Sequence, residues 1–305
     1  MANRSGEARS TRVTRRRMLA GLLLAPLASA CGAQRPANVR IDQVRSTTTP
    51  MADTAPHGKL VFLDPGHGGI DWGAKAQKPD GTWIGEKTYT LDLAKRTAPL
   101  LQQAGYSVVL SRTSEATSDQ WAVNNPPRDL NGDGEIDSID DVQARIDIAN
   151  GVHADLLLSI HLNAHSLPNG AADPSFSGVT TLYDPDRTFS AENKRFAGLV
   201  QAQMLGVVGA ALGRPSHDWG VADDTTLATP FTTAHTSYHH DVELGPSQAG
   251  WIEASRMPGV ISEPLFLTNP DEQATLLRDE LRQAIAAGYV RAIQAYFAGA
   301  QPAGS

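Results

Sequence analysis

The stretch Leu60-Val61-Phe62-Leu63-Asp64-Pro65-Gly66-His67-Gly68-Gly69 decides the fold of this 305-residue chain. Four apolar residues are followed at once by an acidic residue, a proline and a glycine, which predicts a short buried strand that ends in a loop. A second apolar run, Leu156 to Ile160, is followed by His161, and Val260-Ile261-Ser262 is followed by Glu263. Each of these predicted strands therefore has a polar residue directly after it.

Helical patterns separate the strands. Leu91, Ala94, Ala98 and Leu101 share one face of a helix predicted over residues 88–104. The remaining predicted elements are strands over 106–110 and 178–183, and helices over 140–150, 192–212, 271–277 and 279–297. Apolar strands that alternate with helices predict an α/β fold, a single domain with a mainly parallel twisted sheet and helices on both faces. In such folds the active site lies at the C-terminal ends of the strands.

The first thirty residues have the pattern of an export signal. Arg15 and Arg16 form a twin-arginine pattern before the apolar run over residues 19–30, which is too short to span a bilayer as a stable helix. A buried helix that follows arginines by chance is the alternative, but no other stretch combines these features. We expect residues 1–30 to direct the protein to the periplasm or the outer cell surface.

Cys31 is the only cysteine, so it cannot form an intramolecular disulfide. Its position after the apolar run resembles a lipoprotein box, in which the cysteine is lipidated after cleavage. Ala28-Ser29-Ala30 also fits an ordinary cleavage site that would release the protein without an anchor. We favour lipidation, and expect contact with the membrane only through this anchor. Residues 31–58 lack apolar periodicity and predict a flexible tether to a catalytic domain over residues 59–299.

The charge of the chain argues against a partner that is a nucleic acid. The first thirty residues hold six arginines and one acid, so of the 26 basic and 33 acidic residues the rest of the chain keeps 20 and 32, a net charge of −12. Binding to nucleic acid without sequence preference depends on basic clusters that neutralise phosphates. We therefore expect no nucleic-acid partner.

Three residues of the domain are candidate metal ligands. His67 lies in a glycine-rich loop, His161 follows a buried strand, and Glu86 stands at the start of a helix. Each has an ordinary alternative: a loop histidine, a strand-edge histidine, and a carboxylate that the helix dipole favours. Together they match the three protein ligands that a catalytic zinc ion takes while one position stays open for water.

With their flanks, these residues resemble the zinc-dependent N-acetylmuramoyl-L-alanine amidases, the amidase type 3 family of cell-wall hydrolases. The resemblance runs in order through residues 59–297. Its segments are 63–69, Glu86, Arg145 with Ala149-Asn150, 159–164 and 262–270. Pro264-Leu265-Phe266 departs mildly from the residues usual in the family at this point, which concerns the local turn more than the chemistry.

The resemblance implies one catalytic zinc ion, held by His67, Glu86 and His161. It also implies that the substrate is peptidoglycan and that the amide between N-acetylmuramic acid and L-alanine is hydrolysed. Zinc-bound water would be the nucleophile, and Glu263 would act as general base and then as general acid. An exported zinc peptidase that cleaves within the stem peptide is one alternative. A non-catalytic peptidoglycan-binding lipoprotein is another, although intact candidate ligands argue against it. The sequence identifies no regulatory partner.

Residues 129–140 form a second candidate metal site. Asp129-Leu130-Asn131-Gly132-Asp133-Gly134-Glu135 follows the calcium-loop pattern, with Asp140 at the twelfth position in place of glutamate. The expected calcium ligands are Asp129, Asn131, Asp133, Glu135 and Asp140. An acidic turn that caps the next helix is the alternative. We expect a structural calcium ion that steadies this insertion and the wall of the active site.

Residues 222–250 form a long insertion relative to the compact family pattern. The insertion holds His235, Tyr238, His239, His240 and Asp241. A lid over the substrate groove and a loosely ordered surface loop are both compatible with this composition. His165 and His217 are further candidates for contacts around the metal or with the substrate, and the sequence leaves their role open.

Overall fold

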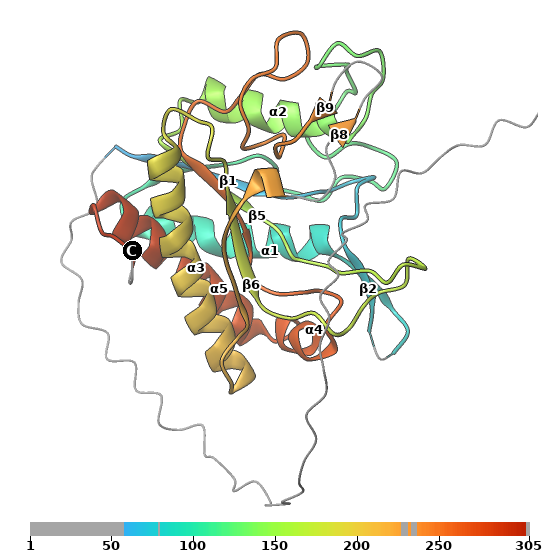
Figure 1. Ribbon diagram of the computed structural model, residues 1–305, viewed down its shortest axis with the longest axis vertical. Coiled ribbons are helices and arrows are strands. Elements are labelled where there is room, and N and C mark those ends of the chain that lie inside the picture. Colours follow the sequence, from blue (N-terminus) through green and yellow to red (C-terminus); the bar gives the residue numbers. More distant parts are fainter. Residues whose placement is uncertain (1–57, 79, 227–230, 233–236, 303–305) are drawn as a thin grey trace, which may run out of the picture.

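The computed structural model describes residues 58–302, except residues 79, 227–230 and 233–236 (Figure 1). The expected export signal, Cys31 and all but the last residue of the expected tether lie outside the described residues.

Six strands form one mixed sheet in the order β4-β1-β5-β10-β6-β7. The first four run parallel to one another, as predicted, whereas β6 is antiparallel to β10 and parallel to β7. The carboxyl ends of β6 and β7 therefore lie at the edge of the sheet opposite to the carboxyl ends of β1, β5 and β10. The bounds of the six strands are β1 Leu60–Pro65, β4 Ser107–Leu110, β5 Leu156–Ile160, β6 Val179–Tyr183, β7 Asp218–Asp223 and β10 Gly259–Glu263.

Helices cover both faces of this sheet, which confirms the predicted architecture. α2 lies on one face, and α1, α3 and α5 lie on the other (Figure 1). The side chains of β1 alternate accordingly, since Val61 and Leu63 belong to the core with α1, α3 and α5, and Phe62 belongs to the smaller core beside α2. The helices are α1 Glu86–Gln103, α2 Ser138–Gly151, α3 Ser190–Leu212, α4 Pro270–Leu276 and α5 Asp279–Phe297, with a 3₁₀ turn, η2, at Asp224–Thr226.

α3 is the one helix of the described part that is long and apolar enough to cross a membrane by length and composition. In the structure it packs against α5 and the sheet, and Phe196, Val200 and Met204 are completely buried there. We therefore assign its apolar character to the core of the domain.

Two short hairpins escaped the sequence analysis, as did β7. β2, Lys75–Gln77, pairs with β3, Trp83–Gly85, directly before α1, and β8, Phe231–Thr232, pairs with β9, Ser237–Tyr238. The second hairpin lies beside α2 (Figure 1). Part of the 222–250 insertion is therefore built into the domain, because Tyr238 and Val242 form a small buried cluster with Trp251, Ile252 and Ile139 of α2.

Candidate active site

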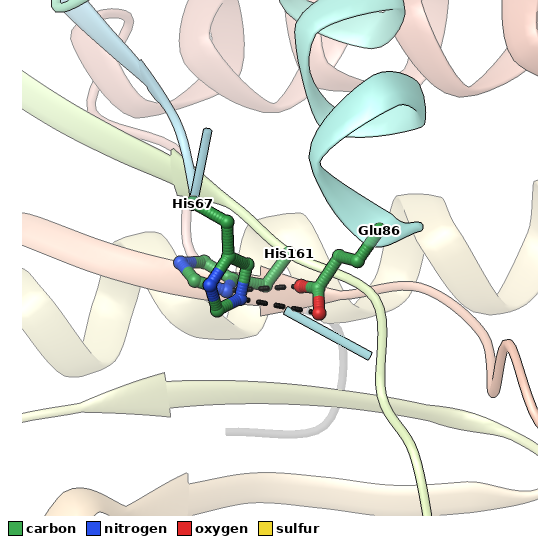
Figure 2. Close-up of side chains that lie close together, drawn as sticks. All are labelled: His67, Glu86 and His161. Carbon is green, nitrogen blue, oxygen red and sulfur yellow. Dashed lines mark hydrogen bonds and ion pairs between the residues drawn. The ribbon is translucent and has the colours of Figure 1, made fainter. Parts of the chain in front are cut away.

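His67, Glu86 and His161 converge at one edge of the sheet (Figure 2). His67 follows β1, Glu86 is the first residue of α1, and His161 follows β5. His67 Nε2 lies 3.1 Å from Glu86 Oε2, and His161 Nδ1 lies 3.0 Å from Glu86 Oε1. The two imidazole rings are 4.7 Å apart, and one ligand atom from each residue fits within 4.8 Å of the others. The structure thus brings together the three residues that the sequence proposed as zinc ligands.

Glycines make this convergence sterically feasible. A Cβ atom on Gly66 would lie 2.2 Å from His161 Nε2, and a Cβ atom on Gly73 would lie 2.4 Å from His67 Cδ2 and 2.5 Å from Glu86 Oε2. His67 itself adopts a φ of 62°, a left-handed conformation that is unusual for a residue with a side chain. The loop after β1 therefore depends on small residues on both sides of the candidate ligands.

Two of the candidate ligands, His67 and Glu86, are also held in place by further partners. His67 Nδ1 lies 2.7 Å from Asp71 Oδ2, which leaves Nε2 directed at Glu86. Glu86 Oε1 accepts a hydrogen bond from the backbone N–H of Leu162, and Oε2 accepts one from Ala74, both at 2.7 Å. Such outer contacts orient metal ligands in proteins. Asp71 was not predicted from the sequence, because its contact with His67 depends on the turn of the loop between Gly68 and Gly73.

The electrostatics of the site favour a positive charge between the ligands. Burial opposes protonation of His67, but the Glu86 carboxylate and the hydrogen bond to Asp71 outweigh it and raise the pKa of His67 to about 10. Burial likewise opposes ionisation of Glu86, yet the two histidines hold the pKa of Glu86 well below its usual range. A bound divalent cation would replace the proton in this role. The donor set of two imidazoles and one carboxylate fits zinc.

Arg145 of α2 secures the loop that carries His67. Its guanidinium donates to Asp64 Oδ1 at 2.8 Å, to the carbonyl of Pro65 at 3.0 Å and to the carbonyl of His67 at 2.7 Å. Burial opposes the charge on Asp64, but the guanidinium beside it lowers the pKa of that carboxyl. The guanidinium also donates to Asp141 Oδ2 at 2.7 Å. The residue picked out in the sequence thus connects α2 to the active-site loop.

Glu263 is the last residue of β10, beside His161. The backbone N–H of His161 donates to the carbonyl of Ser262 at 2.9 Å, so Glu263 follows the residue paired with the end of β5. Glu263 is partly exposed and does not belong to the group of converging ligands. It occupies the same edge of the sheet as the three ligands, as expected from the sequence.

A buried carboxylate that the sequence analysis missed lies behind His161. Asp64, His161 and Glu243 also converge within 4.8 Å, and Glu243 is 4% exposed. Burial, followed by the charges of Asp64 and Asp241, raises the pKa of Glu243 well above its usual range. No local pattern in the sequence marks this residue, because the contact depends on how the 222–250 insertion packs.

The proposed calcium ligands, unlike the candidate zinc ligands, do not converge on one point. Residues 129–140 are all described, but none of their carboxylates belongs to a group of three converging donors. Asp129, Asn131 and Asp133 instead accept backbone N–H groups of the loop itself, and Asp140 accepts those of Leu130 and Asn131. Glu135 is exposed. Asp140 also completes a capping box with Asp137 at the start of α2, so the helix-cap alternative describes part of what the loop does.

His165 and His217 lie in an aromatic group apart from the three candidate ligands. His165 stacks on Phe176 with ring centres 3.7 Å apart, and His217 meets the edge of Trp219. Trp219 is 46% exposed, and its indole N–H donates to the carbonyl of Ser177, which fixes the ring. Phe266, which follows β10, lies against both Phe176 and Trp219, so this group borders the same edge of the sheet as Glu263.

Comparison with known proteins identifies relatives of this domain. Residues 61–295 match the family model for N-acetylmuramoyl-L-alanine amidase. The germination-specific N-acetylmuramoyl-L-alanine amidase of Bacillus subtilis is 27% identical over 240 residues, which cover 79% of this chain and 80% of that protein. AmiA of Salmonella typhimurium is 27% identical over 78% of this chain and 76% of its own length. The crystal structure of an N-acetylmuramoyl-L-alanine amidase from Clostridium difficile 630 superposes with a TM-score of 0.53, at 25% identity, over 79% of this chain and 97% of that one.

Proposed function

Since this chain belongs to the N-acetylmuramoyl-L-alanine amidase family and is therefore an amide hydrolase that acts on peptidoglycan, we propose that it works as a zinc enzyme through His67, Glu86, His161 and Glu263. The observation that supports this proposal most strongly is the convergence of the three ligand atoms within 4.8 Å, from segments far apart in the sequence. His67 and His161 supply neutral nitrogens and Glu86 a carboxylate, a set that leaves a fourth position for the reaction.

The reaction would be hydrolysis of the amide between N-acetylmuramic acid and L-alanine. Zinc, when bound, would polarise the scissile carbonyl and activate a water molecule. Glu263 would accept the proton of the attacking water and then pass it to the departing nitrogen of L-alanine. Asp71 would keep the Nε2 lone pair of His67 directed at the site, because its carboxylate holds the proton of Nδ1.

The exposed face of Trp219 would bind the sugar side of the substrate. The ring is fixed by its hydrogen bond to Ser177 and lies on the edge of the sheet where Glu263 stands. A rigid aromatic ring with one open face is suited to contact with a ring-shaped ligand.

Digestion of purified sacculi tests this function. The proposal predicts that released peptides carry new free amino ends on L-alanine, identified by mass spectrometry. New ends within the stem peptide would identify a peptidase instead. Zinc bound without any cleavage would identify a binding protein, and either result would contradict the proposal.

We also propose that residues 129–140 bind calcium. The support is the sequence pattern, together with a loop in which Gly132 and Gly134 adopt left-handed φ values of 74° and 89° and in which carboxylate oxygens face inward to the backbone. Calcium would displace several of these contacts and brace α2, from which Arg145 reaches the His67 loop. If EGTA leaves both the Tm and the activity of the zinc-loaded protein unchanged, this role is wrong.

The location of the protein is proposed from the sequence alone. Residues 1–30 would export it, and Cys31 would attach it to a membrane. Labelling with palmitate, compared between the wild type and Cys31→Ser, tests the anchor. An exported wild-type protein without label, with Cys31→Ser unchanged in location, would rule out the lipid anchor.

A further inference from the structure

Asp184, Asp224 and His240 form a second group of converging donors, apart from the three zinc ligands. β6 and β7 are parallel, with Tyr183 opposite Asp223, so the next residues, Asp184 and Asp224, stand side by side. His240 approaches from the segment after β9. One ligand atom from each residue lies within 4.8 Å of the others, as in the zinc group.

This second group lies at the opposite edge of the sheet. β6 runs antiparallel to β10, and Glu263 pairs with Thr180. Asp184 is four residues further along β6, roughly 13 Å away at the usual rise of a strand. In this register it lies level with Gly259, the first residue of β10, so it cannot contribute to the active site.

The two carboxylates are buried and incompletely satisfied. Both side chains are 0% exposed. Asp184 Oδ1 accepts the N–H of Asp186 and Asp224 Oδ2 accepts the N–H of Asp241. The other oxygens, Asp184 Oδ2 and Asp224 Oδ1, have no hydrogen-bond partner among the described residues.

His240 does not satisfy them. Its Nδ1 lies 2.7 Å from Asp184 Oδ2, an ion pair when the ring is protonated, and 3.8 Å from Asp224 Oδ2, but this buried nitrogen has no hydrogen-bond partner among the described residues. Two buried carboxylate oxygens and a ring nitrogen thus lie close together without a hydrogen bond between them. A bound cation would satisfy all three atoms.

The nearby polar groups are already engaged elsewhere. Arg187 donates to the carbonyls of Leu244, Gly245 and Ser255 and to the Ser255 hydroxyl, and the Tyr238 hydroxyl donates to the carbonyl of Pro246. Asp186 and Asp241 add further negative charge around the group. The buried carboxylates thus lack a protein cation that hydrogen-bonds to them.

We propose that Asp184, Asp224 and His240 bind a divalent transition-metal ion that fastens the 238–252 segment to the ends of β6 and β7. Two carboxylates and one imidazole suit zinc or manganese better than calcium or magnesium, which prefer oxygen ligands alone. The backbone contacts that hold one oxygen of each carboxylate leave the other oxygen directed at the ion. The same segment carries Glu243 to His161, so the ion would also steady the wall behind the active site.

A shared proton is the competing occupant. In the absence of a cation, burial and the charge of Asp184 raise the pKa of Asp224 to about 8, so Asp224 could be protonated and donate to Asp184. Asp224→Asn separates the two cases, because asparagine can donate a hydrogen bond as a protonated aspartate does but is a poor metal ligand.

The experiment measures zinc per chain by mass spectrometry of the metal, in a buffer that contains excess calcium so that residues 129–140 do not compete. We expect two zinc ions in the wild type, one in Asp224→Asn, one in His240→Ala, and two in His239→Ala, the matched control at the exposed neighbouring histidine. If neither Asp224→Asn nor His240→Ala holds fewer zinc ions than the wild type, the proposal is overturned.

A second measurement shows whether the variants fold, and it tests this metal site in protein that lacks two of the proposed catalytic ligands. In protein that carries His67→Ala and His161→Ala, zinc should still raise the Tm, since an ion that binds only the folded state stabilises it. Adding Asp224→Asn should abolish that rise. If Asp224→Asn instead keeps or raises the Tm and zinc has no effect in either protein, the pair holds a proton and the metal proposal is wrong.

Discussion

Gly73 shows how little space surrounds the proposed zinc ligands. Its φ is 63°, and a Cβ atom there would press on both His67 and Glu86. We predict that Gly73→Ala weakens zinc binding by displacing these side chains, beyond the cost of about 1–2 kcal/mol that a left-handed alanine imposes on the fold. Competition with a chelator of known affinity measures the change.

Gly81 provides the matched control for this prediction. Its φ is 83°, and no atom lies closer to its virtual Cβ than Gln77 Nε2 at 4.0 Å. Gly81→Ala should therefore share the backbone cost and leave zinc affinity unchanged. Equal losses of affinity in both variants would show that backbone strain, and not contact with the ligands, explains the result.

Asp71 is the residue whose effect on zinc should be largest among those that do not bind it. Its carboxylate lies 2.7 Å from His67 Nδ1 and fixes the ring. We predict that Asp71→Asn lowers zinc affinity by about 10- to 100-fold, as measured by chelator competition. Asp80→Asn, at an exposed carboxylate further along the same connection, should have no effect. An unchanged affinity in Asp71→Asn would mean that the ring is oriented by its other contacts.

Some residues of the candidate sites could be predicted from the sequence, and others could not. His67, Glu86 and His161 were predictable because each stands beside a clear strand or helix boundary and within a family pattern. Asp71 lies on the same loop as His67, but its partner depends on the turn at Gly68 to Gly73. Glu243 and the Asp184–Asp224 pair depend on contacts between elements distant in the sequence, which no local pattern encodes.

Arg145 is the main connection between α2 and the loop that carries His67. It is 2% exposed and pairs with Asp64, which is 1% exposed. We predict that Arg145→Met lowers the free energy of unfolding by about 3–5 kcal/mol, because it leaves a buried carboxylate without its cation. Denaturant unfolding measures the loss.

Arg256→Met is the comparison for that variant. Arg256 pairs with Glu253 at the surface, where its side chain is 66% exposed, so its removal should cost at most about 1 kcal/mol. A similar loss in the two variants would contradict the structural role of Arg145.

Glu272 of α4 joins two other elements and makes their junction sensitive to pH. Its carboxylate accepts the N–H of Gly178 before β6 and the N–H of Phe266 after β10. Burial outweighs these two donors and raises the pKa of Glu272 to about 7 from 4.5. The folded state thus holds the proton of Glu272 more tightly than the unfolded state. The contribution of this group to the free energy of unfolding is therefore present below pH 4.5 and is lost as the pH rises toward 7.

Glu272→Gln tests this pH dependence, because glutamine does not titrate. We predict that the stability of the wild type relative to the variant falls by at most about 3 kcal/mol between pH 4.5 and pH 7. Denaturant unfolding at several pH values gives this difference. A constant difference across the range would show that Glu272 keeps an ordinary pKa.

The sequence predicted the main elements well and the small ones poorly. β1, β5, β10 and the long helices have continuous apolar runs or clear helical faces, and their bounds agree with the predictions to within two residues. β2, β3, β8 and β9 span two or three residues each, too few to establish a period. β7 is half-buried at the edge of the sheet, and Gly220 interrupts its pattern. The reversal of β6 was not predicted either, because strand direction depends on which neighbour the strand finds.

In the whole molecule, the topology explains why residues 67, 86, 161 and 263 lie at one edge of the sheet. β1, β5 and β10 are neighbours and parallel, so residues nearly 200 positions apart reach one edge, while α1 begins at the same edge with Glu86. β6 and β7 end at the opposite edge, where the second group of donors lies. The two edges thus separate the proposed catalytic zinc from the proposed structural metal.

The three proposed ligands would hold zinc while Glu263 would transfer the proton, and the activity of Glu263→Gln distinguishes these two roles. The measurement is kcat/KM on purified peptidoglycan fragments, with zinc content determined on the same samples and Glu280→Gln, at an exposed glutamate, as control. We predict that Glu263→Gln keeps its catalytic zinc and loses about 10²- to 10⁴-fold in kcat/KM, while the control matches the wild type. Activity within tenfold of the wild type, or loss of that zinc ion in Glu263→Gln, would contradict it.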